Sequence, residues 1–260
     1  MKHPSPLQYA YAIGRVRALE NFLVGRDVFR EAADAPDFQS ALKMISDAGR
    51  FGGNLTGIKD SEDLDDVLAA EEERLFVLLD EILLDREVLE VIRLLRRPEQ
   101  AFESAGKTDS GFIRDYVRHL ADLGNLKMFA RAKYLGLAAA SFEGMALGGG
   151  FMGKEVFLAG YGRPLRDLGP GLDPRYRPLW EKAVLTLEER ETFVALESGI
   201  EDFLMTYLRR AKYMVFGPEP VFSYALAKQR ELGLVRLVGI GKINLIPAER
   251  IKERVSETYV

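Results

Sequence analysis

The sequence predicts an all-α protein, and three observations lead to this prediction. Apolar residues recur with helical spacing along almost the whole chain, whereas the alternation typical of strands is nearly absent. Several segments begin at capping residues and end at glycine or proline, as helices do. One helical segment recurs later in the chain. Repeated helical units bury their apolar faces by stacking, so the repeat predicts related units around a shared core.

The first half of the chain divides into helices at clear start and stop signals. We expect helices over Leu7–Val24, from Phe38 to a stop at Gly49, over Leu64–Arg96 with Pro98 as the stop, and after a cap at Asp109 or Ser110. The FGGN segment after Gly49 is expected to be a loop, because its glycines interrupt the helical pattern.

The second half begins with a proline-rich segment. Residues 163–178 hold four of the eleven prolines and are expected to form a connecting loop between helical units over 1–162 and a helical unit over 179–260. The expected helices of the last unit are Leu187–Met214, Val221–Gly233 and a short one over Ala248–Val255 after Pro247. Leu234–Ile240 is short and rich in β-branched residues, so a strand competes there, but helix is favoured.

Composition excludes several classes of function. The chain has 260 residues, no cysteine and two histidines, His3 and His119, so thiol catalysis, disulfide scaffolds and histidine-rich metal centres are excluded. No apolar run approaches the roughly 18–20 residues that cross a bilayer, and the N-terminus lacks a signal-peptide core, so we expect a cytoplasmic, soluble protein.

Charge is unevenly distributed along the chain. The formal net charge is −4, but residues 60–90 carry a net −11 and the remainder a net +7. Nucleic-acid binders show a dominant basic stripe, so nucleic acid is not an expected partner. The acidic segment is either a solvated helix face or a docking surface for a basic partner.

A twelve-residue segment occurs twice. DLGNLKMFARAK at Asp122–Lys133 aligns without gaps with ELGLVRLVGIGK at Glu231–Lys242, and acid, Leu, Gly and Lys match at their positions. A weaker copy at Asp85–Arg96 is better explained as chance similarity between amphipathic helices. We expect the two strong copies to occupy equivalent places, with Leu126, Phe129 and Leu237 buried.

A glycine-rich motif resembles a nucleotide site in spacing alone. Gly148–Lys154 reads GGGFMGK, which satisfies the P-loop spacing. A P-loop follows a strand and carries Ser or Thr after its lysine to hold Mg²⁺, whereas here a helical pattern precedes the motif and Glu155 follows it. We therefore expect a tight turn between helices and no nucleotide cofactor, with a nucleotide-dependent enzyme as the disfavoured alternative.

Other polar groups fail to form a catalytic set. His119 lies near Asp115 and Asp122 on one helix face, but no Ser, Cys or second His completes a site, so a hydrogen-bonded structural histidine is favoured over a proton-transfer pair. The basic residues Arg209, Arg210 and Lys212 are expected to complement the end of a helix dipole. The single Trp180 is expected to anchor packing. No catalytic, cofactor-binding or metal site is predicted.

Three segments together resemble a known family. YAYAIGRVRALENFL at Tyr9–Leu23, DLGNLKMFARAKYLG at Asp122–Gly136 and the tail at Phe216–Val255 resemble the central-stalk subunit of V/A-type rotary ATPases, called C in bacterial and archaeal enzymes and d in eukaryotic ones. The chain looks like a shortened member: family proteins carry two clear Asp-x-x-Asn-Leu units before the C-terminal one, whereas only Asp122–Leu126 is clear here and Val88 replaces the Asn in Asp85–Leu89.

The resemblance implies a non-enzymatic part of an ion-translocating complex. Family membership implies an all-helical cup or funnel that links the shaft subunits to the membrane rotor ring, in the cytoplasm and peripheral to the membrane, for ATP-coupled proton or sodium transport. A diverged helical adaptor with another partner is the alternative. The candidate partner contacts are the acidic Glu71, Glu72 and Glu73 and the basic Arg131 and Lys133.

Overall fold

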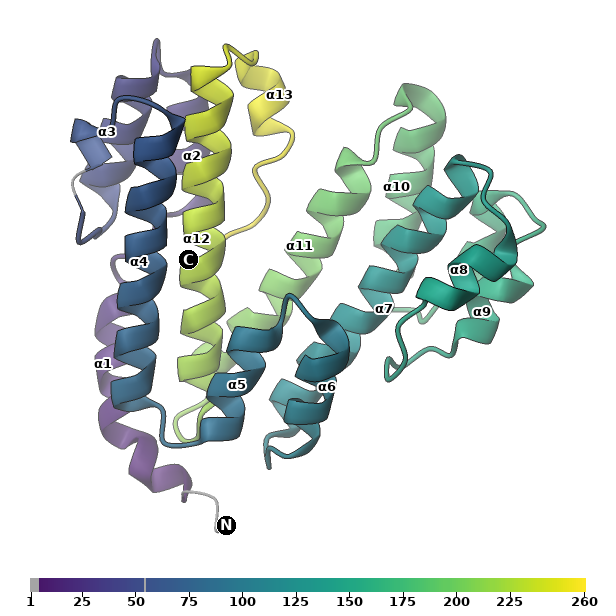
Figure 1. Cartoon of the computed structure of the whole chain (residues 1–260), viewed down its shortest axis with the longest axis horizontal. Coiled ribbons are helices and arrows are strands. Elements are labelled where there is room, and N and C mark those ends of the chain that lie inside the picture. Colours follow the sequence, from purple (N-terminus) through teal and green to yellow (C-terminus); the bar gives the residue numbers. More distant parts are fainter. Residues whose placement is uncertain (1–4, 54) are drawn as a thin grey trace. The chain divides into compact units, whose positions relative to one another are not determined.

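The computed structural model describes residues 5–53 and 55–260 and divides the chain into two compact units. The first unit comprises residues 1–92 and 205–260, and the second comprises residues 93–204. His3 lies outside the described residues. Within the described ranges every regular element is a helix and no strand occurs, which confirms the all-α prediction (Figure 1).

The first unit contains most of the N-terminal helices and the C-terminal ones. Its elements are η1 (Pro6–Tyr9), α1 (Ala10–Glu20), α2 (Arg26–Asp34), α3 (Phe38–Ala48), η2 (Leu55–Gly57), α4 (Ser61–Ile82), α5 (Arg86–Leu94, which ends in the second unit), η4 (Arg210–Tyr213), α12 (Glu219–Ile243) and α13 (Ala248–Lys252). Leu234–Ile240 lies within α12 and is helical, as expected.

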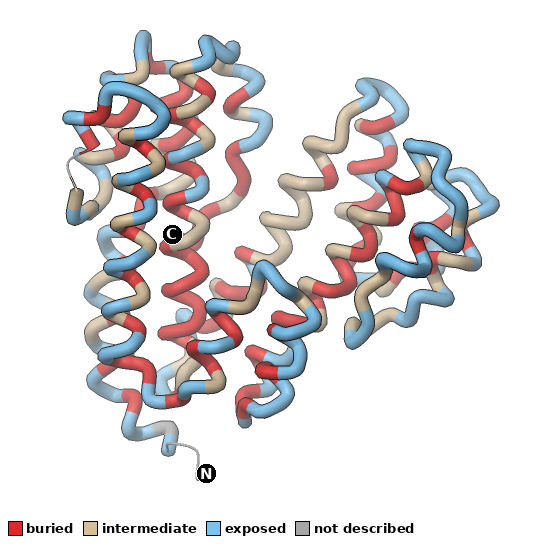
Figure 2. The backbone as a smooth tube through the Cα atoms, in the orientation of Figure 1, coloured by how far each residue is buried: buried red, intermediate tan, exposed pale blue. Residues whose placement is uncertain are grey.

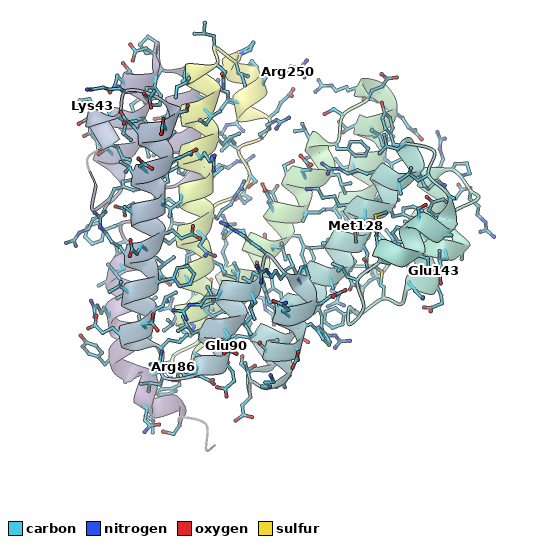
Figure 3. The ribbon with its side chains drawn as sticks, in the orientation of Figure 1. Lys43, Arg86, Glu90, Met128, Glu143 and Arg250 are labelled. Atoms are coloured by element: carbon cyan, nitrogen blue, oxygen red, sulfur yellow. The ribbon has the colours of Figure 1, made fainter. Side chains whose placement is uncertain are left out.

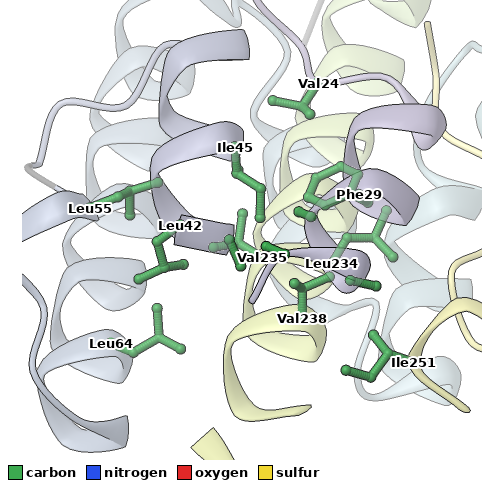
Figure 4. Packing of buried hydrophobic residues seen from close by; sticks show 14 of the residues in the cluster. Val24, Phe29, Leu42, Ile45, Leu55, Leu64, Leu234, Val235, Val238 and Ile251 are labelled. Atoms are coloured by element: carbon green, nitrogen blue, oxygen red, sulfur yellow. The ribbon is translucent and has the colours of Figure 1, made fainter. Parts of the chain in front are cut away.

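The core of the first unit forms around α12. This helix is apolar on nearly all sides, and such a helix is stable only when neighbours surround it. It packs against α1, α2, α3, α4 and α13, and Figure 2 shows buried residues along most of its length. Leu42, Leu64, Val235 and Val238 meet in the apolar cluster of Figure 4. Leu237, in contrast, is only half-buried, so its expected burial is wrong: it lies at the margin of this cluster.

The second unit is built on a long helix of its own. Its elements are α6 (Pro98–Gly106), α7 (Gly111–Tyr134), α8 (Ala139–Met145), α9 (Lys154–Ala159), η3 (Leu165–Gly171), α10 (Arg177–Arg190) and α11 (Val194–Arg209, which ends in the first unit). Ser110 is the N-cap of α7 and its hydroxyl accepts a hydrogen bond from the Ile113 amide at 3.2 Å. Leu126 and Phe129 are fully buried, as expected.

The proline-rich segment belongs to the core of the second unit. Leu168, Leu172 and Tyr176 are buried with Trp180, whose indole donates to the Leu165 carbonyl at 3.1 Å. The predicted packing role of Trp180 is confirmed. Residues 163–178 therefore differ from the expected connecting loop between units over 1–162 and 179–260, because their apolar side chains are needed inside one unit and the boundaries fall at 92/93 and 204/205.

Two predicted long helices are interrupted, so their expected continuity is wrong. The Leu187–Met214 helix ends at Arg190, where Glu191 adopts a left-handed conformation (φ 52°), and α11 starts only at Val194. The Leu64–Arg96 region is likewise two helices, because the backbone is extended at Leu83. In both places helical periodicity continues across the break, so the sequence pattern alone did not reveal it.

Candidate functional site

Of the three adjacent acidic residues predicted to contact a partner, Glu71 is buried. Its carboxylate accepts hydrogen bonds from the amides of Gly52 and Gly53, at 2.7 and 2.9 Å, and pairs with Arg74. The glycines belong to the expected FGGN loop, which this carboxylate holds against α4. Glu71 thus satisfies backbone donors that would otherwise lack an acceptor inside the protein.

The other two acids of this run have different surroundings. Glu72 is half-buried on α4 and accepts a hydrogen bond from the Gln229 side chain of α12 at 3.3 Å. Glu73 is exposed. Consecutive residues on a helix point about 100° apart, so the three carboxylates do not form one surface. Partner contact by any of them stays a prediction, and of the three only Glu73 is exposed.

The predicted basic contacts lie in the last turns of α7. Arg131 pairs with Glu197 of α11, which Lys127 also approaches at 3.3 Å. The Lys133 ammonium donates to the carbonyls of Gly160 and Tyr161, at 3.2 and 2.9 Å, directly after the end of α9. Desolvation by these surroundings lowers the pKa of Lys133. Lys133 therefore holds the C-terminal end of a helix, whereas about half of the Arg131 side chain remains exposed.

Asp122, at the start of the repeated segment, binds the glycine-rich loop. Its carboxylate is fully buried and accepts from the amides of Phe151 and Met152, at 2.9 and 3.1 Å, and from the Tyr176 hydroxyl at 3.0 Å. Burial raises the pKa of Asp122, although the three hydrogen bonds favour its charged form. Sequence reasoning identified Asp122 as a residue of the repeat and of the family motif and as a neighbour of His119, but not as the group that binds this loop. The loop amides that Asp122 binds are 29 and 30 residues later in the chain, so no local sequence pattern reveals this contact.

Asn125 completes the attachment of the same loop. Its amide nitrogen donates to the Leu147 carbonyl at 2.8 Å, and its amide oxygen accepts from the Leu147 amide at 2.7 Å. A Cβ atom on Gly150 would overlap the Asp122 carboxylate, and Gly149 has a φ of 84°. The loop therefore requires glycine for close approach and for its backbone conformation.

His119 belongs to the same buried network and is a hydrogen-bonded histidine, as the sequence favoured. Its Nδ1 lies 2.6 Å from the Tyr176 hydroxyl, and its Nε2 lies 3.4 Å from Arg175. Asp115, the other carboxylate considered for a proton-transfer pair, lies instead 3.9 Å from Arg118. The Tyr176 hydroxyl donates to Asp122 and thus joins the histidine to the carboxylate.

The second copy of the repeat attaches a helix in the first unit. Glu231 is buried, accepts from the Val24 amide at 2.7 Å and pairs with Lys228. Burial raises the pKa of Glu231. At the other end of the copy, Lys242 donates to the carbonyl of Ala35, the residue that follows α2. The acid therefore binds just before α2 begins and the lysine where α2 ends.

Both copies thus form the same structural device. In each, an acid on a long helix binds one or two amides just before a short helix, and a lysine eleven residues later binds one or more carbonyls just after it. The long and short helices therefore run in the same direction, and each charge has the sign that complements the nearby end of the short-helix dipole. We call this arrangement the acid–lysine clamp. It explains why acid and lysine recur in the repeat.

The weaker copy does not form a clamp. Asp85 directly precedes the short helix α5 instead of lying within a long one, and its amide donates to the Tyr9 hydroxyl at 2.9 Å. Its likeness to the strong copies is therefore one of composition, as expected.

The GGGFMGK segment lies between two helices, as its sequence predicted. It connects α8 to the short helix α9, and Lys154 is the first residue of α9. The Lys154 ammonium pairs at 3.0 Å with Glu143 of α8, which Figure 3 labels on that helix. The lysine of the motif is therefore engaged with a carboxylate, and the glycines serve the loop that Asp122 binds.

Among the residues that the structure describes, no helix is both long enough and apolar enough to cross a membrane.

Comparison with known proteins agrees with the resemblance found in the sequence. The model of the ATP synthase (C/AC39) subunit family matches residues 93–254, which is more than half of the chain. The C subunit of the V-type sodium ATPase of Enterococcus hirae is 36% identical over 72 residues, which are 28% of this chain and 22% of the relative. The match therefore spans about a fifth of that relative's length. From the family match, which includes the whole second unit and both copies of the repeated segment, the chain belongs to the ATP synthase (C/AC39) subunit family.

Proposed function

We propose that the chain is the rotor-coupling subunit of a V/A-type rotary ATPase. It links the shaft subunits to the membrane rotor ring and passes torque between ATP chemistry and the movement of protons or sodium ions. It has no catalytic role of its own and acts in the cytoplasm, peripheral to the membrane. The observation that carries this proposal is family membership over residues 93–254, together with the likeness to the C subunit of a V-type sodium ATPase.

The clamps supply a physical reason why such a chain suits mechanical coupling. A part that transmits torque must not deform internally under load. Each clamp joins a short helix at both ends to a long helix through hydrogen bonds to the charged side chains of an acid and a lysine, and such bonds are stronger than those between neutral groups. These bonds support stiffness within each unit. The assembly of the units into a cup or funnel stays a prediction.

Charged surface groups are the proposed partner contacts. A joint between a shaft and a ring benefits from charge complementarity, which speeds correct docking and weakens with salt. Glu72, Glu73 and Arg131 retain exposed or half-exposed side chains. Glu71 and Lys133 bind the backbone of their own unit, so we propose that they affect a partner only through the fold.

Isolation of the native complex tests the function. We expect a tagged chain, recovered from gently solubilised native membranes, to bring with it shaft and ring subunits of a rotary ATPase, identified by mass spectrometry. Recovery of a different, reproducible partner without these subunits would contradict the proposal and would support a diverged adaptor of the same fold.

The contact residues are tested by salt and by neutralisation. We expect binding to the recovered shaft or ring subunits to weaken between low and high salt, and the double variant Glu72→Gln/Glu73→Gln to reproduce part of that loss. The matched control is Glu181→Gln/Glu189→Gln, which removes the same charge from exposed positions on α10. Equal behaviour of the two double variants would show that the acidic pair is not a contact.

A further inference from the structure

A cleft in the second unit is not used by the clamp or by the proposed coupling role. Its volume is about 410 Å³, within the range of sites for small ligands or peptide side chains. It lies between α6, the first half of α7 and the glycine-rich loop. The lining residues are Phe102, Ala105, Gly106, Arg114, Asp115, Arg118, Gly149 and Gly150.

Arg118 is held in place in this cleft without using its hydrogen-bond donors. Its guanidinium lies over the Phe151 ring at 3.9 Å from the ring centre, and Arg175 lies over the same ring at 4.2 Å. Its ion-pair partner Asp115 is 3.9 Å away, which is too far for a hydrogen bond. Across residues 5–53 and 55–260, no protein group accepts a hydrogen bond from the Arg118 guanidinium.

Arg114 adds a second guanidinium one turn earlier on α7. One of its terminal nitrogens donates to the Thr108 carbonyl at 2.5 Å, which fixes the side chain and leaves its other donors unused within the described residues. A planar guanidinium presents several N–H groups in a fork that matches an oxyanion. Two such groups on the wall of one cleft, already held by other contacts, would lose little side-chain entropy on binding an oxyanion.

The rest of the lining limits the charge and shape of the ligand. Arg114 and Arg118 carry two positive charges and Asp115 one negative charge, so the lining has a net charge of +1. A single carboxylate balances that charge, whereas a polyphosphate exceeds it several-fold. Phe102, which is 40% exposed, and Ala105 give the cleft an apolar wall against which the aliphatic part of a side chain can pack.

The glycine-rich loop keeps the cleft open. The side-chain positions of Gly149 and Gly150 are occupied by the Phe102 ring and by the Asp122 carboxylate, so no side chain from the loop fills this space. Because Asp122 binds the amides of Phe151 and Met152, the clamp fixes the loop and with it the floor of the cleft.

We propose that this cleft binds an acidic segment of a partner protein. One Asp or Glu carboxylate of the segment accepts hydrogen bonds from Arg114 and Arg118, and its methylene groups pack on Phe102 and Ala105. The proposal concerns the chemistry of the recognised segment and does not depend on which complex supplies it.

Binding of a labelled acidic peptide to the full chain tests this site. The probe is fluorescein-labelled pentaglutamate, with pentaglutamine as the uncharged control, measured by fluorescence anisotropy at low salt. We expect saturable binding of pentaglutamate only, and a Kd at least tenfold higher for Arg114→Gln/Arg118→Gln. Arg163→Gln removes a positive charge from an exposed position of the same unit and is expected to leave the Kd within twofold.

Several outcomes would overturn the proposal. An equal loss in Arg163→Gln would show general charge attraction, and no saturable binding would show that the cleft is not a site. Pyrophosphate that binds more tightly than the peptide, and depends on the same arginines, would assign the cleft to a phosphate instead. Arg114→Gln alone leaves the stacking of Arg118 on Phe151 intact, so it keeps the test valid if the double variant unfolds; its Kd is expected to rise about threefold or more.

Discussion

The second halves of α7 and α12 perform the same task with different chemistry. Asp122 of α7 is surrounded by neutral donors, namely two backbone amides and the Tyr176 hydroxyl. Glu231 of α12 binds one backbone amide and a buried cation, Lys228. The comparison shows that position, not a particular partner, is what the repeat preserves: a carboxylate must lie where a short helix begins.

The ends of the two helices extend the likeness beyond the aligned residues. The amide of Leu137 donates to the Ala132 carbonyl, and the amide of Ile246 donates to the Gly241 carbonyl, each at 2.9 Å. Both helices therefore finish in the same Schellman motif, which needs one residue with positive φ. That residue is Gly136 (φ 66°) in α7, but the α12 equivalent is Leu245 (φ 53°).

Removal of the two acids is expected to have the largest effect and to separate the two chemistries. Glu231→Ala leaves the buried Lys228 without its counter-charge and should lower the free energy of unfolding by about 3–5 kcal/mol. Asp122→Ala leaves neutral hydrogen-bond donors without an acceptor and should lower the free energy of unfolding by about 2–4 kcal/mol. Chemical denaturation of each variant measures both values.

A second substitution, added to each of these variants, distinguishes the charged surroundings of Glu231 from the neutral surroundings of Asp122. Lys228→Met should restore much of the stability lost in Glu231→Ala, because it removes the uncompensated cation. Tyr176→Phe should restore little in Asp122→Ala, because the two loop amides remain unpaired. Equal rescue in both units would contradict the distinction between a charged and a neutral environment.

The pH dependence of stability should have opposite signs for two carboxylates of the second unit. The pKa of Asp122 is raised by burial, so its contribution is fully present below its ordinary pKa and is lost as the pH rises through the raised value. Arg175 lowers the pKa of Asp173 to about 2, so the contribution of Asp173 is present above its ordinary pKa and is lost as the pH falls toward 2.

Asn variants measured across acidic pH check this sign difference. The wild type should lose some stability with rising pH because of Asp122, and this loss should be absent from Asp122→Asn. It should gain some stability with rising pH because of Asp173, and this gain should be absent from Asp173→Asn. Denaturation midpoints at several pH values between about 3 and 7 provide the comparison. Changes of the same sign in both variants would contradict the assigned surroundings.

The lysines at the far ends of the clamps should matter less than the acids. Lys133→Met and Lys242→Met each remove donors from carbonyls at the end of a short helix, which water can partly replace, so each should cost about 0.5–1.5 kcal/mol. Amide hydrogen exchange should quicken mainly in α9 for the first variant and in α2 for the second. Lys182→Met, an exposed lysine on α10, is the control and should change neither.

The smallest effects are expected at the two helix ends. Leu245 is 89% exposed and has positive φ, so Leu245→Gly relieves backbone strain and should stabilise the protein by about 0.5 kcal/mol. Gly136→Leu imposes the same strain on α7 and should cost about 1 kcal/mol. Thermal unfolding of both variants tests this, and a loss of stability in Leu245→Gly would show that the leucine side chain packs favourably.

Sequence reasoning predicted the helices well where the evidence is local. Periodicity and caps located α3, the start of α7 to within one residue (Asp109 or Ser110) and the helical state of residues 234–240, because a helix depends on residues a few positions apart. The repeat was also visible, and so was the position of Gly148–Lys154 between two helices. Family membership followed from the same residues.

Tertiary structure alone decided which charged residues are available to a partner. Glu71, Glu72 and Glu73 form one acidic cluster in the sequence, yet Glu71 is buried against a loop nineteen residues earlier in the chain. Lys133 resembled a basic contact, yet it binds carbonyls nearly thirty residues away. Such pairings follow from how helices pack, and the sequence near each residue contains no record of its distant partner.

Contacts between residues far apart in the sequence also explain why the predicted unit boundaries differ from those of the structure and why the clamp was not predicted. Proline content predicted a connecting loop at 163–178, but burial of Leu168, Leu172 and Tyr176 made that segment part of a core. The sequence by itself determined that helices form, where most of them begin and that one unit of them recurs, because these properties arise from short-range sterics and hydrogen bonding. Only the tertiary structure decided that an acid and a lysine of each copy hold a second helix, because their partners come together through the packing of whole helices.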